Sequence, residues 1–402
     1  RMKGRTNPPV DRGYLVGIAF FILGLGTLLP WNFFMTASLV RTGLKCSGEW
    51  RNGTAVVGKN YYFNNWMTLL SQLPLLLFTL LNSILYQRIS EAIRIAGSLV
   101  FILLFFIFTA VLVKVPMDAD RFFSVTMATI WFINSFGAVL QGSLFGLVGL
   151  LPQKYSAIFM SGQGLAGTFA AVAMLLAIGS DAGSETAALG YFITPCVGTL
   201  VTLISYLLLP HLVNGTKVAF LSMEQEERGQ SKASVIEVFK KIWVMAFCVT
   251  FVFTVTLSVF PAVTADVKTI FHSWDRFFIA VCCFLTFNLG DWFGRTVTTF
   301  VRWPAKESRL FPGLVVSRVL FVPLLMLCNV QSRAYLPVFF YHDAVFTVIM
   351  VLFSVSSGYF VCLSMSYAPQ LVEPKDAETA GALMTFFLAL GLSLGAALSF
   401  PL

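Results

Sequence analysis

Long apolar runs alternate with short polar connections along almost the whole chain. Eleven of these runs are long enough for an α-helix to cross a bilayer, which takes about 20 residues at a rise of about 1.5 Å each. We expect spanning helices at residues 14–40, 66–86, 95–115, 122–151, 157–178, 186–210, 242–263, 277–303, 310–330, 344–368 and 379–402. The pattern predicts an all-α polytopic membrane protein with 11 transmembrane helices packed against a lipid bilayer.

The run at 277–303 differs from the others because polar residues interrupt its middle. Asn288, Asp291 and Arg295 follow one another at spacings of three and four, which places them on one face of a helix. An ionised side chain near the bilayer centre costs about 2.5–3.5 kcal/mol on insertion scales, so these groups need partners or a water-filled cavity. We expect this helix to line such a cavity.

Composition supports the membrane class, since 57% of the 402 residues are hydrophobic and 11% are charged, against about 25% charged in soluble domains. The net charge of +8 could indicate a nucleic-acid partner, but the basic residues lie mainly in the short connections, so we expect no nucleic acid. Alternate connections carry 16 Lys and Arg on one side and 9 on the other. The N-terminus is therefore predicted to be cytoplasmic, and the C-terminus extracellular.

This topology also divides the chain. The connection at 41–65 lies outside the cell and contains Asn52-Gly-Thr, which predicts N-glycosylation at Asn52. The longest inside segment carries the charged stretch MEQEERGQSK between six helices and five. We predict an N-terminal six-helix bundle at 1–209, a cytoplasmic linker at 210–241 and a C-terminal five-helix bundle at 242–402. Such a division is typical of transporters that work by alternating access.

Signatures of catalysis are missing from the sequence. It has neither a G-x-x-x-x-G-K-[ST] loop nor an H-E-x-x-H motif, and Asp291 is the only acidic residue inside the apolar runs. The seven cysteines lack metal-ligand spacing. We expect no enzyme activity, no metal and no cofactor.

Several motifs resemble the equilibrative nucleoside transporter family over essentially the whole chain. They are LGLGTLLPWNFF at 23–34, QGSLFG at 141–146, SGQGLAG at 161–167, FPAVT at 260–264, FNLGDWFGR at 287–295 and ETAGALM at 378–384. Two further stretches, FNNWMTLLSQLPLLLFTLLNS and GYFITPCVG, are most similar to the second mammalian member. Gly137 instead matches the first member, which is more sensitive to adenosine-reuptake-type inhibitors. The resemblance implies an MFS-like fold that moves purine and pyrimidine nucleosides down their gradient.

The chemistry of Asp291 and Arg295 suits a nucleoside. A ribose diol offers two hydroxyl donors that one carboxylate can accept, while Arg295 balances the charge and donates to sugar oxygens. The two charges nearly cancel, which favours a neutral ligand over a nucleotide. The alternative is a structural ion pair that joins this helix to the next, where Arg318 is also within the membrane.

Residues from other helices are candidates for the base. Gln141 offers both a donor and an acceptor, Gly137 on the same face leaves space, and Trp31 offers an aromatic surface. By matching to the family, further pocket residues are Leu28, Met35, Gln72, Leu75, Phe284, Asn288 and Leu392. Gln72 stands where other members can carry Met, which suggests altered selectivity toward nucleobases.

Alternating access also requires gates. Arg94 and Glu378 match family positions of an inner gate between the bundles, although solvated charges there would contribute less than about 1 kcal/mol. Met35 with the Phe260-Pro261 bend is expected to narrow the outer path. The sequence gives Gln163 no role.

The leading interpretation is facilitative, uncoupled nucleoside transport at the plasma membrane. One alternative is proton-coupled transport in an endomembrane compartment, with Asp291 as the titrating group. Another is a non-transporting membrane receptor, which 11 helices with an interior charge pair fit poorly. The oligomeric state is not predicted.

Overall fold

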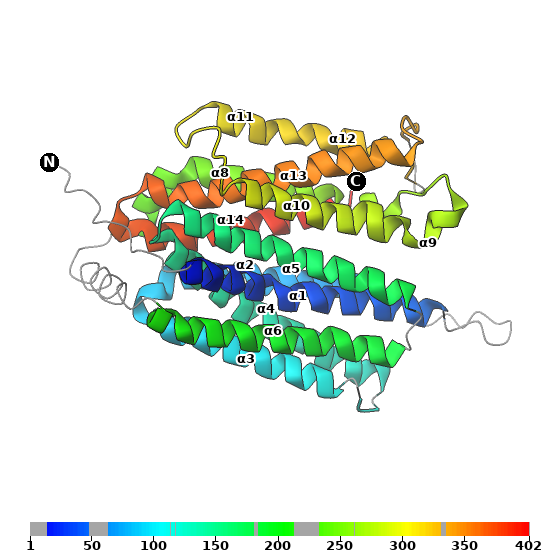
Figure 1. Cartoon of the computed structure of the whole chain (residues 1–402), viewed down its shortest axis with the longest axis horizontal. Coiled ribbons are helices and arrows are strands. Elements are labelled where there is room, and N and C mark those ends of the chain that lie inside the picture. Colours follow the sequence, from blue (N-terminus) through cyan, green and yellow to red (C-terminus); the bar gives the residue numbers. More distant parts are fainter. Residues whose placement is uncertain are drawn as a thin grey trace.

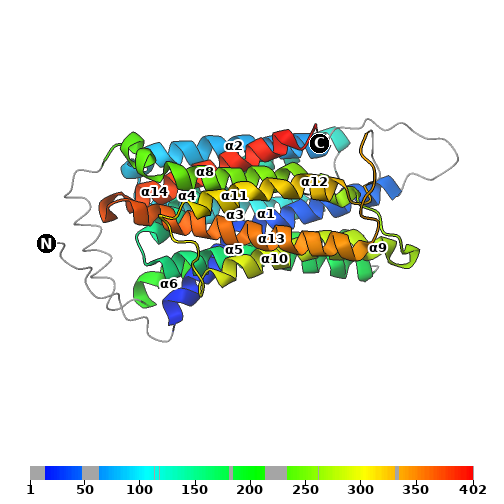
Figure 2. The ribbon, with the colours of Figure 1, turned by 90° about the horizontal axis from the view of Figure 1, so that it is seen from above.

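The computed structural model describes residues 14–47, 63–112, 114–116, 118–180, 184–212, 233–260, 262–330 and 335–401. Nearly all regular structure in these ranges is helical, and the long helices run side by side along the long axis of the molecule (Figures 1 and 2). The predicted all-α class is confirmed. Asn52 and Pro261 lie outside the described residues, as does most of the predicted linker at 210–241.

The helices follow the predicted runs closely. They are α1 (Leu15–Ser47), α2 (Phe63–Leu85), α3 (Glu91–Leu112), α4 (Ala119–Gly149), α5 (Gln153–Gly179), α6 (Ser184–Leu212), α8 (Val235–Val259), α9 (Asp275–Phe278), α10 (Thr286–Val297), α11 (Leu310–Ser317), α12 (Phe321–Met326), α13 (Asp343–Tyr367) and α14 (Ala377–Leu398). A π-helical stretch, η5 (Ile279–Leu285), connects α9 to α10.

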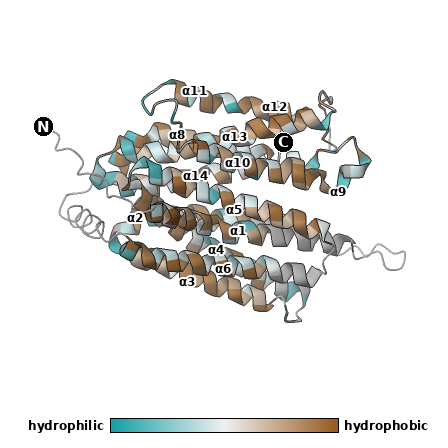
Figure 3. Cartoon of the chain, viewed as in Figure 1, coloured by the Kyte–Doolittle hydropathy of each residue, from teal (hydrophilic) through white to brown (hydrophobic). Residues whose placement is uncertain are grey.

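Within the described ranges, eight helices are long and apolar enough to cross a membrane. Their outward faces carry exposed large apolar side chains, such as Leu104 and Leu176, and the ribbon in Figure 3 is brown, the colour of hydrophobic residues, along much of their length. A face of this kind is stable against lipid rather than water. The chain is therefore a multi-pass membrane protein. The predicted run at 66–86 lies in the continuous helix α2, whereas the runs at 277–303 and 310–330 form interrupted helices.

The run at 277–303 departs most from its prediction as one continuous helix. Regular α-helix ends at Val297, and the chain continues through turns to Pro304, whose preceding residue Trp303 is disfavoured from helical geometry. The backbone N–H of Trp303 donates instead to the Tyr359 hydroxyl at 3.1 Å, and that hydroxyl donates to the Trp303 carbonyl.

Helices from the two halves of the sequence lie mostly on opposite sides of the molecule in Figure 1. In the first half, α1 packs on α5 and α6, and α4 packs on α2 and α3. In the second half, α13 packs on α8 and α10, and α14 packs on α8. The main contacts between the halves are those of α5 with α10 and α13, and of α14 with α2 and α4.

Small residues in α5 permit close packing on both of its sides. A Cβ on Gly162 would lie 2.2 Å from the Phe21 carbonyl oxygen of α1, and one on Gly164 would lie 2.8 Å from Trp292 Cα of α10. Only glycine fits at either position without moving a backbone. The small residues of α5 thus allow two neighbouring helices to approach it closely.

Candidate functional site

Asp291 and Arg295 form the predicted ion pair on α10. Arg295 Nε lies 2.8 Å from Asp291 Oδ2, and the side chains are 8% and 13% exposed for Arg295 and Asp291. The Nε–H is not aligned for a hydrogen bond with any described residue, so the attraction between the charges holds the pair. A charged pair in an apolar span is stabilised by further polar partners.

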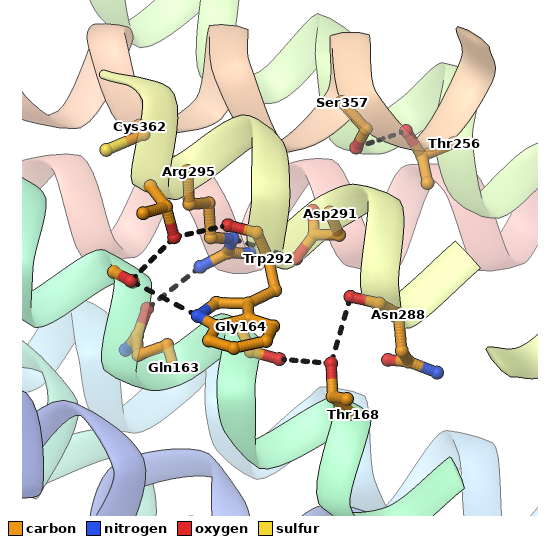
Figure 4. Close-up of polar contacts among 12 residues, drawn as sticks. Gln163, Gly164, Thr168, Thr256, Asn288, Asp291, Trp292, Arg295, Ser357 and Cys362 are labelled. Carbon is orange, nitrogen blue, oxygen red and sulfur yellow. Dashed lines mark hydrogen bonds and ion pairs between the residues drawn. The ribbon is translucent and has the colours of Figure 1, made fainter. Parts of the chain in front are cut away.

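One of those partners is Gln163 of α5. Arg295 Nη1 donates to Gln163 Oε1 at 3.2 Å, and the dashed lines of Figure 4 show this contact crossing from α10 to α5. Sequence reasoning missed this role. The available signal was a glutamine inside a run of small residues in a spanning helix, since a polar side chain at that depth needs a partner.

Three more hydrogen bonds join α5 to α10 beside this contact (Figure 4). Trp292 Nε1 donates to Ser161 Oγ at 3.3 Å, and the hydroxyls of Ser161 and Thr296 are 2.8 Å apart. Thr168 Oγ1 donates to the Asn288 carbonyl at 3.2 Å. Hydroxyl and indole groups therefore line the contact between the two helices along about two turns of α10.

Asn288 extends the polar face toward the π-helical stretch, which contains Phe284. Asn288 Nδ2, on α10, donates to the Phe284 carbonyl of that stretch at 2.8 Å. The Phe284 ring meets Phe260 edge-on at 5.7 Å between centroids, and Phe260 stacks on Phe287 at 3.9 Å. The predicted pocket residue Phe284 and the predicted gate residue Phe260 thus belong to one aromatic cluster.

The candidates for base recognition lie on α4 and α1. Gln141 is 7% exposed, and a Cβ added to the half-buried Gly137 would have nothing within 4 Å. Trp31 stacks near Phe34, with centroids 6.1 Å apart and rings at 9°. The half-buried Leu28, Met35 and Leu392 pack against the same large apolar core as Trp31.

On α2, Leu75 is half-buried and Gln72 has an unusual environment. Gln72 Oε1 is buried and accepts no hydrogen bond from any described residue. A buried acceptor without a donor costs about 1–3 kcal/mol. A water or ligand donor at this position would remove that cost.

Arg94 and Glu378 form a second buried ion pair between the halves. Arg94 Nη2 lies 3.2 Å from Glu378 Oε1, with side chains 6% and 13% exposed. Arg94 Nη1 also donates to Ser143 Oγ at 3.0 Å, and its guanidinium lies 5.7 Å from the Tyr86 ring centroid. The pair is enclosed by protein rather than solvated, so the surface-pair estimate does not apply to it.

Arg318 donates its hydrogen bonds to other helices of the second half rather than to the ion pair of α10. Its guanidinium is 1% exposed and donates to the carbonyls of Val252 and Phe353 at 3.2 and 3.0 Å. It also donates to Thr256 Oγ1 at 3.1 Å and Ser356 Oγ at 3.0 Å. These partners lie on α8 and α13. Arg318 itself lies between α11 and α12, so it connects that segment to both helices. Among the described residues, no group of three His, Cys, Asp or Glu could hold a metal ion.

Comparison with known proteins gives a consistent result. The model of the nucleoside transporter family matches residues 127–216 and 213–402. The chain is 52% identical to equilibrative nucleoside transporter 2 of Rattus norvegicus and 52% identical to that of Homo sapiens, with 98% of each chain covered. It is 48% identical to human equilibrative nucleoside transporter 1, again over 98% of each chain.

Solved structures share the fold at low identity. The human organic anion transporter MFSD10 matches with a TM-score of 0.51 at 16% identity, over 97% of this chain and 93% of that one. The Major Facilitator Superfamily transporter FucP in its outward conformation matches with a TM-score of 0.51 at 10% identity, over 96% and 98%. This likeness supports the predicted MFS-like architecture.

Proposed function

Because the chain belongs to the equilibrative nucleoside transporter family, we propose that it carries purine and pyrimidine nucleosides down their concentration gradient across a membrane. The observation that carries this proposal is 52% identity to equilibrative nucleoside transporters over 98% of both chains. Like these relatives, the protein is a transporter and not an enzyme.

The proposed topology has 11 membrane-spanning helices, a cytoplasmic N-terminus and an extracellular C-terminus. Helices at each of the 11 predicted runs and the asymmetry of Lys and Arg support it. The six-helix bundle at 1–209 and the five-helix bundle at 242–402 move relative to each other around the contacts of α5 with α10 and of α14 with α2 and α4. Residues 210–241 are the cytoplasmic linker.

The ribose binds at the ion pair of α10. Asp291 accepts hydrogen bonds from both hydroxyls of the sugar, and Arg295 donates to sugar oxygens with its guanidinium N–H groups. The adjacent opposite charges favour a neutral substrate, because a nucleotide phosphate would meet the Asp291 carboxylate. This arrangement selects nucleosides over nucleotides.

The base lies toward the first half of the chain. The Gln141 amide pairs with the mixed donor and acceptor edges of purines and pyrimidines, and Trp31 provides a flat apolar wall. Space beside Gly137 admits bulky groups of adenosine-reuptake-type inhibitors. The remaining wall consists of Leu28, Met35, Gln72, Leu75, Phe284, Asn288 and Leu392, and the unpaired Gln72 oxygen accepts from nucleobase N–H groups.

Two gates control access to this site. The buried Arg94–Glu378 pair keeps the cytoplasmic side closed in this conformation. Met35 and the aromatic cluster of Phe260, which Pro261 follows in the sequence, narrow the outer path. The protein works at the plasma membrane and is glycosylated at Asn52.

Purified protein in liposomes tests the proposal. Labelled uridine and adenosine should enter saturably, exchange against internal unlabelled nucleoside, and show no dependence on a proton gradient. Empty liposomes and the Asp291→Asn variant serve as controls. Uptake that requires a proton gradient would replace facilitation with coupled transport, and absence of counterflow would reject a carrier.

A further inference from the structure

The contact between Gln163 and Arg295 is the point at which the candidate ribose site touches the first half of the chain. Asp291 and Arg295 both belong to α10, whereas Gln163 belongs to α5, 132 residues earlier in the sequence. Movement of α5 against α10 therefore changes the surroundings of Arg295 directly.

The backbone around Gln163 keeps its side chain in this contact. Gly162 lies against the Phe21 carbonyl of α1, and Gly164 lies against Trp292 of α10. Gln163 itself is 2% exposed. With α1 on one side and α10 on the other, the side chain has no route to lipid or water unless the helices separate.

Only half of the Gln163 amide is satisfied in this conformation. Oε1 accepts from Arg295 Nη1, but Nε2 is buried without a hydrogen-bond partner among the described residues. An unpaired buried donor disfavours the arrangement that contains it relative to one in which the donor finds an acceptor. The contact thus combines a hydrogen bond to a charged group with a penalty that another conformation can relieve.

We propose that Gln163 is a positioning residue that restrains the empty transporter by holding Arg295 to α5, and that a bound nucleoside releases it. The inference rests on the proposed transport function. In the empty protein, reorientation of the halves breaks the hydrogen bond between Gln163 and Arg295. A nucleoside that accepts from Arg295 and offers an acceptor to Gln163 Nε2 replaces this hydrogen bond, so the loaded protein reorients more easily than the empty one.

Two transport modes separate these steps. Equilibrium exchange uses only the loaded protein in both directions, whereas zero-trans influx also requires return of the empty protein. The ratio of the maximal exchange rate to the maximal zero-trans rate therefore reports how slowly the empty protein returns. A residue that merely stabilises the fold would change both rates together and leave the ratio unchanged.

The test compares Gln163→Met and Gln163→Glu with the parent protein in liposomes, using labelled uridine. Gln163→Met preserves length and removes the hydrogen bond, so the ratio should fall by about tenfold, or to one if the parent ratio is smaller, as expected for loss of one hydrogen bond to a charged group. Gln163→Glu converts the contact to an ion pair and should raise the ratio. The KM for exchange should change less than the ratio in Gln163→Met.

Tyr191→Phe is the matched control. It removes a hydrogen bond of 3.0 Å from Tyr191 to the Ala173 carbonyl, which joins α6 to α5 within the first half. Its ratio should equal that of the parent. If Gln163→Met does not fold, Gln163→Asn, whose amide is too short to reach Arg295, should give the same decrease.

The outcomes are distinct. Unchanged ratios in the Gln163 variants, with exchange intact, would overturn the role of Gln163 and leave nucleoside transport standing. Equal decreases in Gln163→Met and Tyr191→Phe would also overturn it, because the effect would then belong to α5 stability. A parent protein without exchange would reject the transport function itself.

Discussion

Arg94 of α3 and Glu378 of α14 are 284 residues apart in sequence, yet Arg94 Nη2 and Glu378 Oε1 lie 3.2 Å apart in a buried ion pair. Close backbone packing surrounds it, since a Cβ on Gly381 would lie 2.4 Å from the Phe145 carbonyl oxygen of α4. One end of the interface between the halves is therefore closed by both charge and shape.

Glu378→Gln should open this end more often. Removal of one charge leaves the Arg94 guanidinium buried without its counter-ion, which destabilises the closed arrangement. We expect the apparent affinity for uridine added outside to fall and that for uridine added inside to rise, measured in oriented vesicles. The reversed pair Arg94→Glu with Glu378→Arg should recover most of the parent behaviour.

Glu373→Gln provides a matched control for this prediction. It breaks an ion pair of the same length, Lys375 Nζ to Glu373 Oε2 at 3.2 Å, but Glu373 is 60% exposed. Exposed pairs contribute little, so this variant should behave as the parent does. Equal effects of the two substitutions would contradict a gating role for Glu378.

Asp291→Asn should remove discrimination for the sugar diol. Asn keeps one carbonyl acceptor, so one hydrogen bond to a charged group, about 1.5–3 kcal/mol, is lost, and the affinity for uridine should fall about 10–100-fold. The affinity for 2′,3′-dideoxyuridine, already weak in the parent, should change little. Competition against labelled uridine measures both, and a variant that still prefers uridine would exclude the diol contact.

Gly137 and Gly358 should respond oppositely to alanine. An added Cβ at Gly137 has nothing within 4 Å, so Gly137→Ala should keep parent stability and uptake while weakening inhibitors that fill this space. At Gly358 of α13 the Cβ would lie 2.2 Å from the Asp291 carbonyl oxygen. Forcing α13 away from α10 should cost about 1–3 kcal/mol.

Thermal unfolding in detergent and inhibitor binding separate the two variants. Gly358→Ala should unfold at a lower temperature and lose uptake, because the displaced backbone is that of Asp291. Parent-like stability of Gly358→Ala would show that α10 and α13 pack less closely than the structure indicates.

Arg318→Met should destabilise the second half of the chain. It leaves the Val252 and Phe353 carbonyls without their side-chain donor, and loss of the buried network should cost about 3 kcal/mol or more. Arg318→Lys should recover part of the loss, because an ammonium cannot reach all partners of a planar guanidinium. Arg309→Met, at an exposed position before α11, should unfold at the same temperature as the parent protein.

The features that could be predicted from the sequence are those that depend on the spacing of residues within one segment. Apolar runs gave the helices, and spacings of three and four gave the face of Asp291 and Arg295, because both depend on neighbours in the same segment. The family motifs predicted the membership that the comparisons confirm. The roles of individual pocket residues remain predictions.

Contacts between distant helices could not be predicted in this way. Gln163 and Arg295 meet through the packing of α5 on α10, and nothing periodic in either segment identifies the partner. Arg318 donates partly to backbone carbonyls, which every residue has, so its partners leave no trace in the sequence. The end of α10 at Val297 lies inside an apolar run, so the apolar pattern alone did not indicate it.

The π-helical stretch at Ile279–Leu285 determines how α10 is rotated about its axis relative to α9. Each residue of an α-helix rotates the chain by about 100° around the helix axis. A π-helical residue rotates it by less, so the direction of every later side chain changes. Cys283 can thereby face Thr264, with Sγ 3.3 Å from Oγ1, while Arg295 three turns later faces α5. The helical geometry of this stretch thus determines the direction in which Asp291 and Arg295 point. Insertion or deletion of one residue before Thr286 would rotate both side chains to new directions without altering either residue.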